Sequence, residues 1–408
     1  MTSSSLLARV SPEARAAIYH FTVFGSAGVA SVYFGIWLAN RGIRPEEVGI
    51  INAAPVLLML LVNVFIGRLA DRARDWRSAI IVLSLFSGFV AFGLLFVSGF
   101  WGILLVWTLS MMPAAAAVPI VDAATLRMTQ RRGTDFGIVR AWGTVGFMAT
   151  TFAAGPLIAA FGDGAFAPLF VGVAVARAAL SLQLPAFRGD RSAEPVVAAT
   201  TPAAGKLREI MKPWFIATLL GLGIVYSTHS AIGAFAALLW VEQGISEALI
   251  GPLIAFMAAA EAVMMFLWTR LKFKASARHL ILIAALVAVL RYAAMAFSPP
   301  VWVLFGLQML HSITFAVGYF GGIYFIANWT REEIAAEAQG FSYVLQQAMS
   351  VIVLVGMGWC VQAFGAGAWL VLSGYAMLGA VCVLISLRLW RPLAATQPPP
   401  VTSAPADV

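Results

Sequence analysis

The stretch Gly67-Arg68-Leu69-Ala70-Asp71-Arg72, followed by Arg77, decides the fold of this chain. It lies between two long apolar runs, Val48–Phe65 and Ala79–Val97. Glycine and alanine let helices approach closely, an aspartate can accept hydrogen bonds at a helix N-terminus, and arginine side chains can reach the lipid surface. The pattern therefore predicts a short charged connection between two membrane-spanning helices.

The composition agrees with a membrane protein. Of the 408 residues, 61% are hydrophobic and 11% are charged, which lies outside the range of soluble domains. Apolar segments long enough to cross ~30 Å of hydrocarbon give about twelve predicted spans. These are 16–38, 46–67, 78–98, 101–125, 137–160, 166–186, 214–239, 247–269, 278–297, 302–326, 338–362 and 367–389. We predict an all-α polytopic membrane protein with twelve transmembrane helices.

The distribution of positive charge predicts the orientation in the membrane. The loops expected outside contain only Arg41 and Arg44. The loops expected inside hold Arg68, Arg72, Arg74, Arg77, Arg131, Arg132, Lys206, Arg208, Lys212, Lys272, Lys274 and Arg278. By the positive-inside rule we expect a multi-pass protein of the inner (plasma) membrane with both termini cytoplasmic. Topology accounts for the net charge of +8, so no nucleic-acid partner is implied.

The chain divides near its middle. Residues 187–213 are rich in polar residues, proline and basic residues, and they predict a cytoplasmic linker between two six-helix halves. The halves are expected at 1–186 and 214–390, and residues 391–408 are expected to form a disordered cytoplasmic tail.

The opening stretch resembles the signature G-x-L-A-D-R-x-x-x-R of the major facilitator superfamily. A second resemblance is carried by Arg140-Ala-Trp142-Gly143, by Gln308-Met-Leu-His311 and by Glu261 and Arg291. These positions are similar to the phenylpropionate-permease-like branch, which is related to lactose permease and nucleoside proton symporters. The resemblance implies two pseudo-symmetric six-helix halves around a central cavity. It also implies proton-coupled import of a small organic solute, such as an aromatic carboxylate, by alternating access.

Ionisable residues inside predicted spans point to a binding site independently. A charge in the bilayer interior costs at least ~2.5–3.5 kcal/mol, so it faces a cavity or a partner. A rise of ~1.5 Å per residue places His229, Arg291 and His311 about 20–22 Å, and Glu261 roughly 13 Å, from the cytoplasmic helix ends. We predict that these four residues and Gln308 bind the solute and the proton. The alternative is that Glu261 and Arg291 form a buried pair that only orders the bundle.

The predicted mechanism uses Glu261 and Arg291 as a direct pair. A solute carboxylate that binds Arg291 through a bidentate fork would release Glu261 to take a proton. His311 and Gln308 would orient the solute. The alternative is that these two residues and His229 only form hydrogen bonds between helices.

In the first half, Asp122 and Arg140 form a possible substrate or gate pair. Lactose permease holds its sugar with an acid and an arginine on the corresponding two helices, whereas the shallower depth expected here favours a gate or a structural pair. Arg127 is an alternative partner for Asp122. No partner is evident for Arg177, so its side chain is expected to extend to the lipid surface.

The cytoplasmic gating motif comprises Gly67, Asp71, Arg72 and Arg77, of which Asp71 and Arg72 are expected to latch the cytoplasmic side. The main alternative to import is a proton-coupled exporter, because Gly155-Pro156 matches part of an antiporter signature. A non-transporting solute sensor is a third hypothesis. No nucleophile–base pair or metal-ligand spacing is evident, so we expect no enzyme, cofactor or metal. The partners expected are a small solute, protons and the lipid bilayer, with a monomer as the functional unit.

Overall fold

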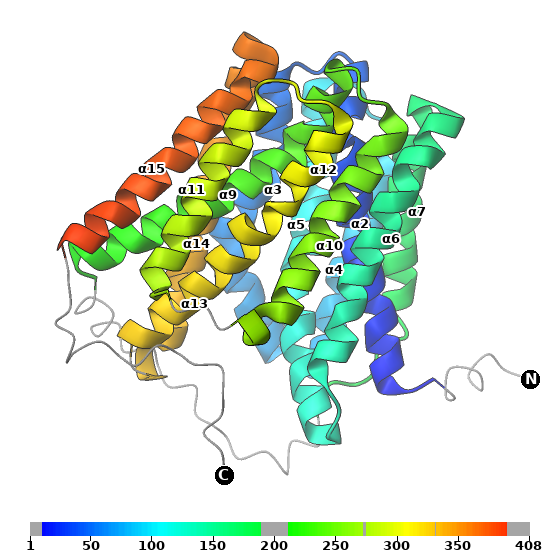
Figure 1. Ribbon diagram of the computed structural model, residues 1–408. Coiled ribbons are helices and arrows are strands. Elements are labelled where there is room, and N and C mark those ends of the chain that lie inside the picture. Colours follow the sequence, from blue (N-terminus) through cyan, green and yellow to red (C-terminus); the bar gives the residue numbers. More distant parts are fainter. Residues whose placement is uncertain (1–9, 189–210, 272–274, 331, 390–408) are drawn as a thin grey trace, which may run out of the picture. The chain divides into compact units, whose positions relative to one another are not determined.

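The computed structural model describes residues 10–188, 211–271, 275–330 and 332–389, which contain helices and no strands (Figure 1). The helices are α2 (Pro12–Asn40), α3 (Pro45–Arg72), α4 (Trp76–Ala91), α5 (Gly99–Arg132), α6 (Phe136–Phe161), α7 (Phe166–Ser181), α9 (Pro213–Glu242), α10 (Glu247–Leu271), α11 (Ala277–Met295), α12 (Val301–Met309), α13 (Gly318–Trp329), α14 (Glu332–Phe364) and α15 (Ala368–Leu389). Helix therefore occupies every predicted span, and the predicted all-α fold is confirmed.

Ten segments of the described residues are long and apolar enough to cross a membrane. One of them, Glu337–Leu389, covers most of α14 and all of α15, and α7 is apolar but shorter than the others. The predicted count of twelve is therefore not fully confirmed by length and hydropathy.

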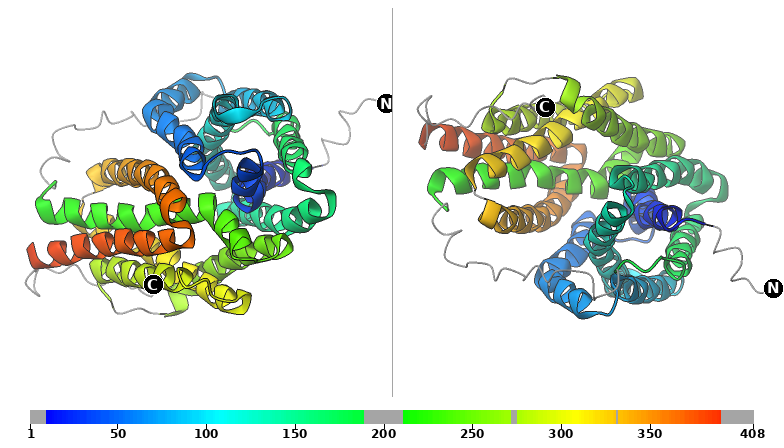
Figure 2. Two further views of the ribbon diagram at one scale, coloured as in Figure 1. Left: turned by 90° about the horizontal axis from the view of Figure 1, so that it is seen from above. Right: turned by 90° about the horizontal axis from the view of Figure 1, so that it is seen from below.

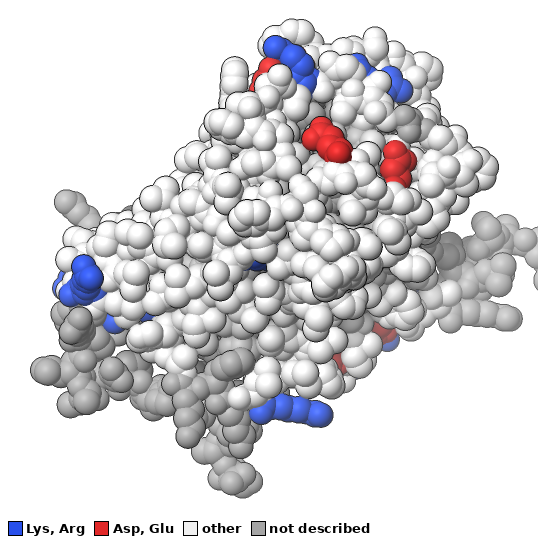
Figure 3. All heavy atoms as spheres, turned by 45° about the horizontal axis from the view of Figure 1, so that its top comes forward, with Lys and Arg blue, Asp and Glu red and all other residues white. Residues whose placement is uncertain are grey.

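The outer surface of the helices is strongly apolar. On the face in Figure 3 most side chains are uncharged. Among the large exposed hydrophobic residues are Phe65, Phe89, Phe96, Phe161, Phe266, Phe297 and Trp302. Soluble proteins rarely expose this much contiguous apolar surface, whereas lipid tails cover it in a membrane protein.

Packing divides the described helices into two compact units, seen from both ends in Figure 2. The first unit contains residues 10–188 together with 240–255, and the second contains 211–239 together with the described residues from 256 to 389. Most of the predicted linker and the predicted tail lie outside the described residues. The boundaries of the predicted halves stay a prediction.

Helix α2 is the best-buried helix of the first unit, and it packs most extensively against α6. Small residues permit this close approach. A Cβ atom on Gly28 would lie 2.6 Å from the carbonyl oxygen of Phe147, and one on Gly146 would lie 2.1 Å from that of Phe21. Both contacts are to backbone, so a side chain here can be accommodated only if the helices separate.

We expect Gly146→Ala to lower the stability of the first unit by about 1–3 kcal/mol or more, as overpacking does. Thermal unfolding of the purified protein in detergent measures this. Gly172→Ala in α7 is a matched control, because a Cβ atom there meets nothing within 4 Å. Equal unfolding temperatures for the two variants would contradict the packing argument.

The motif that opened the sequence lies within a helix, which corrects the expectation of a loop. Gly67–Arg72 form the last turns of α3, and only residues 73–75 connect α3 to α4. Asp75, which the sequence analysis overlooked, caps α4 through the amide of Arg77 (2.8 Å) and accepts from the amide of Phe187 (3.0 Å). Arg77 donates from Nη2 to the carbonyl oxygen of Leu182 (2.7 Å). The start of α4 is thus tied to the segment that follows α7.

Candidate functional site

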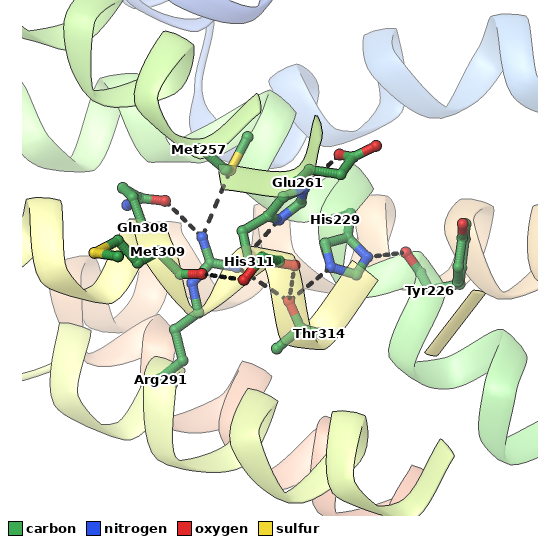
Figure 4. A network of polar contacts seen from close by, with 10 residues as sticks. Tyr226, His229, Met257, Glu261, Arg291, Gln308, Met309, His311 and Thr314 are labelled. Carbon is green, nitrogen blue, oxygen red and sulfur yellow. Dashed lines mark hydrogen bonds and ion pairs between the residues drawn. The ribbon is translucent and has the colours of Figure 1, made fainter. Parts of the chain in front are cut away.

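Six polar residues of the second unit form one connected group, which we call the Glu261 network (Figure 4). Its members are His229 on α9, Glu261 on α10, Arg291 on α11, and Gln308, His311 and Thr314 on the segment from α12 to α13. The structure therefore brings together all five residues predicted here, and it adds Thr314.

Arg291 is the centre of the network. Its side chain is fully buried, and both terminal nitrogens are engaged. Nη2 donates to Oε1 of Gln308 (2.5 Å) and contacts the sulfur of Met257 (3.6 Å). Nη1 lies 3.3 Å from Nδ1 of His311 and 3.4 Å from Oγ1 of Thr314.

His311 connects Arg291 to Glu261. Its Nε2 lies 3.2 Å from Oε2 of Glu261. Because a guanidinium only donates, Nδ1 of His311 accepts from Arg291, and the ring proton therefore lies on Nε2 and is donated to the carboxylate. The predicted direct pair is wrong for this structure: no ion pair joins the described side chains of Glu261 and Arg291, because the imidazole lies between them.

His229 forms the second branch of the network. Its Nδ1 lies 2.9 Å from the carbonyl oxygen of Tyr226, which only accepts, so Nδ1 carries the proton. Nε2 then accepts from the hydroxyl of Thr314 (3.1 Å). The rings of His229 and His311 meet edge to face, with centroids 4.8 Å apart.

The segment after His311 departs from regular α-helix. Residues Ser312–Val317 form a π-helix between α12 and α13. At its start, the amides of Ile313 and Thr314 share the carbonyl oxygen of Leu310, so the chain changes from tight to wide turns within a few residues. Such wide turns rotate the side chains that follow and are frequent at functional sites. The sequence predicted a continuous helix here and gave no sign of this turn.

The first unit holds a smaller cluster, which we call the Asp122 cluster. Nε of Arg140 lies 3.1 Å from Oδ1 of Asp122, so the predicted pair is present. Arg127, the alternative partner, lies instead over the ring of Trp76. The guanidinium of Arg140 covers the ring of Phe24, with its central carbon 4.2 Å from the ring centroid. The side chains of Asp122 and Arg140 are 31% and 30% exposed, so both can be reached.

His20 on α2 completes this cluster and was overlooked in the sequence. Its side chain is fully buried, with Nδ1 3.8 Å from Oδ1 of Asp122 and Nε2 3.3 Å from Oγ1 of Thr125. A histidine within an apolar span of this length was the available signal, by the same cost argument that singled out His229 and His311.

Arg177 corrects another expectation. Its side chain is 2% exposed, and it does not extend to the lipid surface. It donates to the hydroxyls of Ser26 (3.2 Å) and Ser87 (2.5 Å). Ser87 in turn bonds to the carbonyl oxygen of Ser110. Arg177 therefore links α2, α4 and α5 inside the first unit.

The remaining predicted residues lie at the end of α3. Arg72 is exposed, a Cβ atom on Gly67 would meet nothing within 4 Å, and the side chain of Asp71 is outside the described part of the chain. Gly67 and Ala70 line a cavity of about 270 Å³ with Trp76 and Pro119. The latch expected of Asp71 and Arg72 stays a prediction.

Long apolar helices that hold two clusters of ionisable side chains are typical of a polytopic membrane protein. The chain belongs to the MFS_1 like family, whose family model matches residues 14–373, and it is a transporter of the major facilitator superfamily, not an enzyme.

Relatives with known names support this assignment. The chain is 27% identical over 369 residues to a probable 3-phenylpropionic acid transporter of Escherichia coli (strain K12), with 88% of this chain and 94% of that protein covered. It is also 27% identical over 300 residues to the maltose permease of Geobacillus stearothermophilus, covering 70% and 71%. Its fold is similar to the crystal structure of the nucleoside transporter NupG, with a TM-score of 0.79, 14% identity, and 93% and 100% of the two chains covered.

Proposed function

We propose that this chain is a proton-coupled symporter that imports a small organic carboxylate, such as an aromatic acid, by alternating access. It acts in the inner membrane with both termini cytoplasmic, and one copy is sufficient for transport. The observation that carries the proposal is the His311 bridge between Arg291 and Glu261.

Through His311, the protonation state of Glu261 affects the hydrogen bonds of Arg291. While Glu261 is a carboxylate, it accepts from Nε2 of His311, and Nδ1 is free to accept from Arg291. A protonated Glu261 can instead donate its O–H group to Nε2, with the ring proton shifted to Nδ1, which directs an N–H group at the guanidinium. In that arrangement the contact between His311 and Arg291 is broken, and the two arrangements supply two discrete states for alternating access.

Arg140 is better placed than Arg291 to bind the solute carboxylate. Both Nη atoms of Arg291 are engaged in its buried site. The Nη atoms of Arg140 have no hydrogen-bond partner among the described residues, and its side chain is 30% exposed. A carboxylate can bind such a guanidinium through two parallel hydrogen bonds. The ring of Phe24 against the same guanidinium offers an apolar surface for an aryl group.

The glycine that suggested an exporter has a packing explanation. Gly155, part of the motif that suggested an antiporter, packs against backbone of α10, where a Cβ atom would lie 3.0 Å from the carbonyl oxygen of Glu247. Close helix contact therefore explains this glycine without an antiport role.

Counterflow exchange in proteoliposomes tests the solute class without a proton gradient. We expect 3-phenylpropionate outside to drive exchange of labelled 3-phenylpropionate inside, and its amide to be inactive, because the amide has the same shape without the charge. A sugar and a nucleoside are the further members of the panel. Exchange with the amide, the sugar or the nucleoside, but not with the carboxylate, would refute the carboxylate assignment.

A further inference from the structure

Two buried polar atoms of the Asp122 cluster face each other without a hydrogen bond. Nδ1 of His20 and Oδ1 of Asp122 are 3.8 Å apart, which is too long for a hydrogen bond. Nδ1 of His20 has no hydrogen-bond partner among the described residues, and Oδ1 of Asp122 is held there only by its ion pair with Nε of Arg140 (3.1 Å). A buried ring nitrogen without a partner is costly, so an arrangement in which Nδ1 of His20 meets the carboxylate of Asp122 is favoured wherever the helices allow it.

The groups around His20 determine which of its ring nitrogens can donate a hydrogen bond. Its Nε2 faces the hydroxyl of Thr125 on α5, and the guanidinium of Arg140 on α6 lies at the same carboxylate, that of Asp122. Arg177 on α7 donates to Ser26, further along α2. From α3, the apolar Ala70 and Ile66 pack in the core that contains Tyr19, the neighbour of His20. The hydroxyl of Thr125 can donate or accept, whereas the carboxylate of Asp122 only accepts, which favours the tautomer with the ring proton on Nδ1; Thr125 then donates to Nε2.

Arg140 holds Asp122 from the other side, through Nε. Under the proposed function, on which this inference rests, a solute carboxylate draws the guanidinium of Arg140 towards itself. Asp122 then loses its cation, and it remains half-buried as a carboxylate. A second donor for Asp122 would lower the cost of that exchange, and His20 is the side chain placed to supply it.

We propose that His20 is a positioning residue for solute binding: its Nδ1–H group takes over Asp122 when Arg140 turns to the solute. A movement of under about 1 Å would bring the 3.8 Å separation into hydrogen-bond range. The neutral imidazole is sufficient, and no proton is transferred. Solute affinity is thereby set by a residue that does not touch the solute.

The test compares three variants of His20, the Asp122→Asn variant and the double variant by the KM and maximal rate of counterflow exchange. His20→Phe removes the donor and is expected to raise KM about tenfold or more, while the maximal rate changes little. About tenfold is the lower limit for the loss of a hydrogen bond to a charged group. His20→Asn restores KM, because its amide nitrogen occupies the place of Nδ1. His20→Gln does not restore it, because its amide nitrogen occupies the place of Nε2. In an Asp122→Asn background, His20→Phe has no further effect on KM.

Other results would overturn the proposal. A merely structural histidine would be replaced equally well by Asn and Gln, or its effect would add to that of Asp122→Asn. An unchanged KM in His20→Phe would also refute it. If His20→Phe does not fold, the comparison between Asn and Gln decides alone. A failure of the proposed function gives a different result, because wild type itself would then not exchange the carboxylate.

Discussion

Replacing Glu261 with glutamine is expected to abolish proton-driven accumulation of the solute while leaving exchange active. Glutamine can still accept from Nε2 of His311, so the bridge to Arg291 keeps its shape. It cannot bind a proton. With one proton per solute, a pH difference of one unit supports about tenfold accumulation, and we expect the Glu261→Gln variant to reach only about equal concentrations.

The measurement is uptake of labelled 3-phenylpropionate into proteoliposomes under an imposed pH gradient, with counterflow as the companion assay. Glu242→Gln is a control, because this carboxylate lies at the end of α9, away from the network. Full accumulation by Glu261→Gln would exclude Glu261 as the proton site. Loss of both accumulation and counterflow would instead indicate that the side chain serves the fold or the solute.

Replacing Arg140 with alanine is expected to raise the KM for the carboxylate by about tenfold to a hundredfold. Removing one member of a fully buried charge pair weakens binding by more than this factor. The effect is expected to be smaller here because Arg140 and Asp122 are partly exposed to solvent. Arg140→Lys should recover only part of the affinity, because an ammonium cannot form the two parallel bonds of a guanidinium.

Arg127→Ala is the matched control for Arg140→Ala. Arg127 is also a cation of the first unit, but it lies over Trp76 and not on Asp122. Counterflow at a series of solute concentrations separates KM from the maximal rate. An unchanged KM in Arg140→Ala, or an equal rise in Arg127→Ala, would place the anion site elsewhere.

The sequence predicted the helices and five of the six members of the Glu261 network because most of these follow from strong local signals. Apolar runs of this length have few alternatives to membrane helices, and a charged residue within one is rare enough to be noticed. Rise per residue was sufficient to place Glu261, Arg291 and His311 at neighbouring depths.

The order of contacts within the network could not be predicted. Depth does not say which way a side chain points around a helix, so the imidazole between Glu261 and Arg291 was not foreseen. The π-helix after His311 changes that direction again, and it depends on tertiary packing that no local pattern of residues specifies. Arg177 was misjudged for a similar reason, because hydroxyls on other helices enclose it.

The most direct test of the central claim is the flow of protons with the solute. Proteoliposomes that contain a pH-sensitive dye receive 3-phenylpropionate outside, and the signal of protein-free liposomes is subtracted to remove passive entry of the undissociated acid. We predict acidification of the lumen by wild type and none by Glu261→Gln. Carboxylate uptake by wild type without acidification would contradict proton-coupled symport.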